Sequence, residues 1–164
     1  MEIKELYLKT AFCCMACDGD IAPEEVEKIK ELPQFKEMDV RQILSDYLSQ
    51  LKAEGNVFLK KYLDEVKTAN LTEDEECELA NIAIQTIEVD KSVKYNEVAF
   101  FKKIRKRLNA SDEKLLTAIP ENPDVIDQIA PEDYLLPDIT NEDDLSLWTD
   151  SLSNINDVLI EPKQ

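Results

Sequence analysis

Apolar side chains recur along this chain at the spacing of a helix. In residues 40–51 they stand three or four positions apart, so they would line one face of a helix. Similar stretches predict about seven helices, and only two glycines are present for the tight turns of a β-rich fold. The expected helices cover roughly residues 3–17, 23–32, 40–54, 57–70, 73–87, 96–108 and 111–119. We therefore expect an all-α protein.

Local signals mark the starts of several helices. Pro23 stands where a helix accepts proline, at its first position. Asp39 and Ser111 are favourable N-caps, and Thr72 with Glu75 has the spacing of a capping box. These signals predict helix starts independently of the apolar pattern.

The chain carries an internal repeat built on an apolar helix. Residues 11–17 have no charge at all, so we expect the first helix in the centre of the fold. A shift of 72 residues places this helix on the fifth one, Asp18 on Asp90 and Glu25 on Glu97. The repeat predicts a duplicated helical hairpin about a pseudo-twofold axis, with the first and fifth helices in the middle.

The residues around the first repeat turn resemble a known family. Residues 15–25, Met-Ala-Cys-Asp-Gly-Asp-Ile-Ala-Pro-Glu-Glu, look like the acidic signature of the TerB-like (tellurite-resistance) family. Residues 90–101 resemble a second copy, in which Lys91 replaces the glycine. A similar domain occurs at the N-terminus of DnaJ-type co-chaperones of the DjlA kind. The resemblance covers residues 3–119. It implies an all-helical module of tellurite resistance or stress response that binds or senses a metal.

Five acidic residues of the two motif copies are candidate metal ligands. They are Asp18, Asp20, Glu25, Asp90 and Glu97. Carboxylate oxygens suit a hard divalent cation, but the spacing is not that of an EF-hand, so acids from both halves would have to converge. Alternatively, the aspartates bond turn amides and the glutamates serve helix N-termini. We favour this structural role, because short motifs often match by chance.

The cysteines and the absence of histidine narrow the chemistry. Cys13, Cys14 and Cys17 lie at the end of the first helix, where the dipole does not lower a thiol pKa. We interpret them as core residues; a thiol sensor is an alternative that needs exposed thiols. Histidine is absent, and no phosphate-binding glycine loop or Cys-His pair occurs. We therefore expect no enzymatic activity.

Charge divides the chain near residue 120. The net charge is −17, and residues 120–164, with twelve acids and one base, account for −11 of it. We expect a helical domain over 1–119 and an acidic extension over 120–164, whose bulky apolar residues suit a docking segment. Residues 102–107 contain five cations, and we expect the extension to bind there.

The composition also indicates partners and location. A polyanion repels nucleic acid and anionic lipid, and no apolar run is long enough to span a membrane. Cysteines without a secretory signal suggest a cytoplasmic protein. Two functions stay open: a metal-responsive TerB-like module that binds a divalent cation, or a metal-free interaction or scaffold module with a protein partner, regulated by the acidic tail. Apolar surface under the tail could also serve a homodimer.

Overall fold

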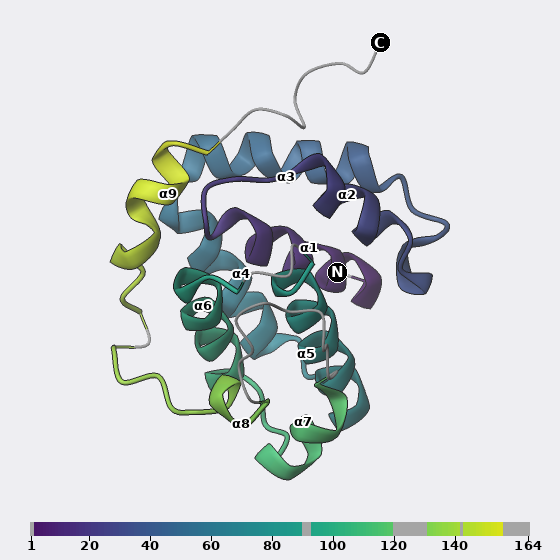
Figure 1. The fold of residues 1–164 in the computed structure, drawn as a ribbon, viewed down its shortest axis with the longest axis vertical. Helices are drawn as coiled ribbons and strands as arrows, with labels where there is room; N and C mark the ends of the chain where they lie inside the picture. Colours follow the sequence, from purple (N-terminus) through teal and green to yellow (C-terminus); the bar gives the residue numbers. More distant parts are fainter. Residues whose placement is uncertain (1, 90–92, 120–130, 142, 156–164) are drawn as a thin grey trace.

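The computed structural model describes residues 2–89, 93–119, 131–141 and 143–155, whose arrangement is drawn in Figure 1. Within these ranges the regular elements are helices and no strand occurs, so the all-α prediction is confirmed. The longer helices are α1 (Ile3–Ala16), α2 (Pro23–Lys30), α3 (Val40–Glu54), α4 (Asn56–Thr68), α5 (Glu73–Ile87), α6 (Tyr95–Lys106) and α7 (Asp112–Ala118). A short 3-10 turn, η1 (Pro33–Phe35), follows α2.

Helices α1 and α5 form the centre of the fold. Every residue of 6–16 in α1 is buried, and α5 packs along this helix. The one charged residue in that stretch, Lys9, pairs with Glu65 Oε1 at 2.8 Å. In Figure 1, α2 and α3 lie above α1, and α7 lies at the opposite end of the molecule. A helix that is apolar on every side must be surrounded, and the prediction of two central apolar helices is confirmed.

The side chains expected to cap helices do so. Asp39 Oδ1 accepts a hydrogen bond from the amide of Gln42 at 3.4 Å, and Ser111 Oγ accepts one from the amide three residues later at 3.2 Å. Thr72 and Glu75 form a reciprocal capping box at the start of α5. Each cap satisfies an amide that the first turn of a helix leaves without a partner.

The described part of the C-terminal segment adds short helices that the apolar pattern did not predict. They are α8 (Pro131–Tyr134), the 3-10 turn η2 (Ser146–Trp148) and α9 (Thr149–Ser153). Elements this short do not complete a helical period in the sequence. Tyr134 and Trp148 are fully buried and belong to the same apolar core as α1 and α5. The division of the chain at residue 120 stays a prediction.

Candidate binding surface

The first acidic motif forms the turn between α1 and α2. Asp18 Oδ1 accepts a hydrogen bond from the amide of Asp20 at 2.9 Å. Gly19, between them, has a φ of +80°, a conformation that favours glycine. A Cβ at this position would meet the carbonyl oxygen of Ser151, in α9, at 2.9 Å. The turn and the close approach of α9 therefore both account for the glycine of the motif.

The motif glutamates close the N-termini of two helices. Glu25 Oε1 accepts a hydrogen bond from the amide of Ala22 at 2.9 Å, at the start of α2. Glu97 Oε1 accepts one from the amide of Lys94 at 3.1 Å, at the start of α6. Both glutamates are buried, and the two pairs are related by the same shift of 72 residues as the repeat. This geometry supports the structural role of the glutamates.

A cavity of about 460 Å³ lies between the first motif turn and the start of α6. Asp18, Asp20 and Glu25 line it, together with Lys94. Asp90 lies outside the described residues. Among the residues that are described, no three His, Cys, Asp or Glu side chains are grouped so that they could hold a metal ion. The four candidate ligands that the structure describes do not form a coordination set on their own, and a divalent cation here stays a prediction.

The cysteines of α1 belong to the core. Cys13, Cys14 and Cys17 are free thiols with no exposed surface. Burial raises the pKa of each thiol well above its ordinary value. The reactive thiolate is therefore disfavoured, and the interpretation as core residues is confirmed.

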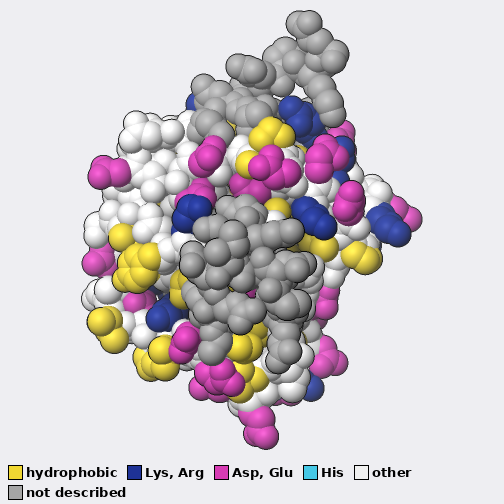
Figure 2. Space-filling view, in the orientation of Figure 1, with side chains coloured by type: hydrophobic (Ala, Val, Ile, Leu, Met, Phe, Trp, Pro, Cys, Tyr) yellow, Lys and Arg dark blue, Asp and Glu magenta, His cyan; other side chains and the backbone are white. Residues whose placement is uncertain are grey.

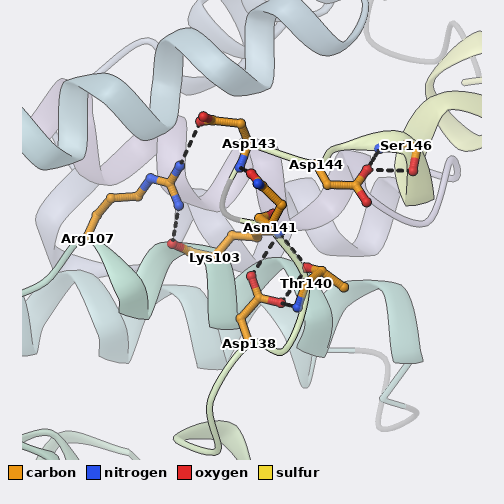
Figure 3. A network of polar contacts seen from close by, with 8 residues as sticks. All are labelled: Lys103, Arg107, Asp138, Thr140, Asn141, Asp143, Asp144 and Ser146. Atoms are coloured by element: carbon orange, nitrogen blue, oxygen red, sulfur yellow. Dashed lines mark hydrogen bonds and ion pairs between the residues drawn. The ribbon is translucent and has the colours of Figure 1, made fainter.

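A buried lysine of α6 holds the C-terminal segment (Figure 3). Lys103 Nζ lies 2.8 Å from Asp138 Oδ2 and donates hydrogen bonds to Thr140 Oγ1 at 2.7 Å and to the carbonyl oxygen of Asn141 at 2.6 Å. Two hydrogen bonds and one ion pair thus surround this buried ammonium, which would otherwise be costly to remove from water. Burial would raise the pKa of Asp138, but the hydrogen bonds from Lys103 and Thr140 outweigh it and hold the pKa below its ordinary value.

Asp143 extends this contact to two more cations. Its Oδ1 lies 3.1 Å from Lys60 Nζ of α4 and 4.0 Å from Arg107 NH2, just after α6. Nearby, Asp144 Oδ1 accepts hydrogen bonds from the amide and hydroxyl of Ser146 at 3.1 and 2.6 Å (Figure 3). Two cations of the 102–107 cluster therefore pair with acids of the C-terminal segment.

Two aromatic side chains anchor the ends of this stretch. Tyr134 donates a hydrogen bond to Glu88 Oε2 at 2.9 Å, and Trp148 Nε1 donates one to the carbonyl oxygen of Asn96 at 3.0 Å. Each aromatic ring packs edge-on against a phenylalanine ring of α6. We call residues 135–141 and 143–147, between the two anchors, the strap. Its ends and its middle are all fixed to the helical body.

An apolar groove of about 660 Å³ lies between α6 and the strap. Its walls include Tyr95, Val98 and Ala99 from α6 and Leu136, Ile139 and Leu147 from the strap. Trp148 also lines it. The volume and the apolar lining are typical of ligand-binding sites in proteins.

Exposed apolar side chains gather at this groove. The large apolar side chains that are exposed in the described residues are Ile139 (97%), Tyr95 (75%), Val57 (53%), Leu136 (52%) and Leu147 (43%). All of them except Val57, in α4, line the groove. Figure 2 shows apolar side chains in yellow at the left edge, where the strap runs in Figure 1. Single exposed apolar residues are ordinary, but a contiguous group indicates an interaction site.

The groove was not among the sites expected from the sequence, although one signal pointed towards it. Acidic and bulky apolar side chains are interleaved over residues 120–164, which indicated docking. The pattern could not tell which apolar residues face the body and which face outward. Leu135 is buried, whereas Leu136, the next residue, is half exposed and lines the groove.

Comparisons with protein-family models, with curated proteins and with solved structures give no match. The TerB-like resemblance is therefore carried by the motif residues alone. Among the described helices, none combines the length and the apolar character needed to cross a membrane.

Proposed function

We propose that this protein is a non-enzymatic interaction module that binds a segment of a partner protein in the groove between α6 and the strap. One observation supports this most directly: Leu136, Ile139 and Leu147 are exposed on a stretch that Lys103 holds in place. Their contact with water is unfavourable by about 25 cal/mol per Å² of apolar surface. A partner that covers them recovers this free energy without first ordering the strap.

The position of Ile139 indicates the size of the occupant. This side chain is almost fully exposed at the edge of the groove, where a small molecule inside the groove would not cover it. A second copy of this chain would bring two net charges of −17 together, which opposes association. A segment of another protein can cover Ile139 and does not bring a second net charge of −17.

Metal sensing is the second candidate function. Asp18, Asp20 and Glu25 line one cavity, although as described they are not grouped so that they could hold a metal ion by themselves. The TerB-like resemblance would place either function in tellurite resistance or stress response. The free thiols of the chain fit a cytoplasmic location.

Selection from a library of random peptides displayed on phage tests the binding function. The full-length protein is the bait, and enriched peptides without tryptophan are then titrated against it. Trp148 is the only tryptophan of the chain and lines the groove, so its fluorescence reports binding there. We expect the double variant Leu136→Ser, Ile139→Ser to weaken binding about tenfold, equivalent to about 1.4 kcal/mol.

Val57→Ser is the matched control, because Val57 is as exposed as Leu136 but belongs to α4 and does not line the groove. It should leave the affinity unchanged. Circular dichroism of the variants checks that the fold is intact. If no peptide is enriched, or if the groove variant and Val57→Ser weaken binding alike, the groove is not the binding site.

A further inference from the structure

The apolar groove and the acidic cavity at the first motif turn share a lining residue. Tyr95, the first residue of α6, lines both. Its side chain is 75% exposed, so it forms a wall that an occupant of either cavity can reach. An extended segment that fills the groove and continues past Tyr95 would meet the acidic residues beyond it.

The charges on the far side of Tyr95 are mostly negative. Asp18, Asp20, Glu24 and Glu25 line that cavity, with Lys94 as the one cation among its described lining residues. Glu24 is exposed in the first turn of α2, whereas Glu25 is engaged in its helix cap. The whole chain adds to this potential with a net charge of −17. Electrostatic complementarity therefore favours a cation on the segment that passes Tyr95.

Tyr95 itself suits both parts of such a segment. An aromatic ring packs against apolar side chains and also attracts a cation placed over its face. The groove selects large apolar side chains, and the acidic cavity next to it selects the charge of the neighbouring residue. Nucleic acid and anionic lipid fit the apolar groove poorly, and both are repelled by the acidic residues.

We propose that the occupant of the groove is a basic peptide segment, in which large apolar side chains enter the groove and an adjacent Lys or Arg lies between Tyr95 and the acidic residues of the first motif turn. This inference rests on the proposed binding function and specifies its ligand. It also gives the exposed acidic residues of the motif turn a role in binding that requires no metal.

The composition of the selected peptides gives the first test. The library is unbiased, so we expect Lys or Arg to be enriched beside the large apolar residues of groove-dependent peptides. One such peptide is then synthesised with its basic residue and with Gln in its place. Each version is titrated against the full-length wild-type protein and against Glu24→Gln, with Glu27→Gln as the control. Glu27 is exposed in the same helix but lines neither cavity.

We expect Glu24→Gln to weaken binding of the basic peptide about threefold and to leave binding of the Gln peptide unchanged, because an exposed ion pair contributes only a small part of the affinity. The loss should lie mainly in the association rate and should shrink as salt is added. Glu27→Gln should change the affinity for the basic peptide and for the Gln peptide to the same extent.

Two different failures can be told apart. Groove-dependent peptides that lack basic residues, or that respond equally to Glu24→Gln and Glu27→Gln, would overturn the basic-segment inference and leave the binding function standing. The absence of any groove-dependent peptide would overturn the binding function and this inference with it.

Discussion

Lys103 and its neighbours differ in burial although they are adjacent in sequence. Lys103 and Arg107, one helical turn apart, are buried, while Lys106 is exposed. The sequence indicated one basic cluster over 102–107, but burial divides it. A run of cations does not show which member faces inward, because that depends on the segment that packs against the helix.

Replacement of Lys103 measures how much its contacts with the strap contribute to the free energy of unfolding. Lys103→Met removes the cation and leaves the largely buried Asp138 carboxylate without its ion pair. We expect the free energy of unfolding to fall by about 3 kcal/mol at neutral pH, the size of effect seen when one partner of a buried pair is removed. Urea unfolding measures this change, and Lys106→Met, at an exposed position, is the control. Equal effects of the two variants would contradict the prediction.

The pH dependence of the same variant provides an independent check. Asp138 has a lowered pKa in the folded protein, so its pairing stabilises the fold above the unfolded value near 3.8 and the stabilisation is lost as the pH falls through the folded pKa. The difference between wild type and Lys103→Met should therefore be largest near neutral pH and should shrink below about pH 4.

At the scale of helices, the sequence predicted features that depend on residues close together in the chain. It missed features that depend on contacts between distant segments. Asp39 and Thr72 cap their helices as expected, because a cap involves residues only a few positions apart. The seven predicted helices correspond to α1–α7. The short elements α8, η2 and α9 were not predicted, because burial of Tyr134 in α8 and Trp148 in η2 against distant helices accompanies them.

The acidic motifs illustrate the same limit for the candidate site. The sequence related Glu25 to Glu97 by the repeat, and the structure places both glutamates in equivalent caps. Whether a carboxylate caps a helix or binds a metal depends on how many oxygens converge from other segments. Spacing along one chain does not determine that number.

A cation series tests the metal hypothesis at these turns. Thermal unfolding of metal-stripped protein is followed in millimolar Ca²⁺ or Mg²⁺ and at matched ionic strength. We expect no cation-specific rise of the midpoint, because Glu25 and Glu97 already accept amide hydrogen bonds. A rise for one cation that the variant Asp18→Asn, Asp90→Asn loses would mean preferential binding to the folded state and would establish a metal site.

At the scale of the whole molecule, the sequence suggested a helical domain followed by an acidic tail. The described part of the tail contributes Tyr134 and Trp148 to the core. It also reaches back to the first motif, where α9 lies against Gly19. Charge and composition change near residue 120, but packing does not follow composition. An acidic segment with a few large apolar residues can be an integral layer of a fold.

Truncation after residue 119 decides between an added tail and an integral layer. We expect the shortened chain to lose most of its stability, because removal of a buried aromatic side chain typically destabilises by about 3 kcal/mol or more and both Tyr134 and Trp148 are lost. The control keeps the full chain but neutralises the exposed acids Glu132, Asp133 and Asp150. In urea unfolding, the control should have a midpoint near that of the wild type, and the truncated chain should have a much lower midpoint.

A truncated chain that unfolds cooperatively near the wild-type midpoint would instead show that residues 1–119 form an independent domain. The strap would then be a detachable wall of the groove, and binding rather than stability would be its main contribution.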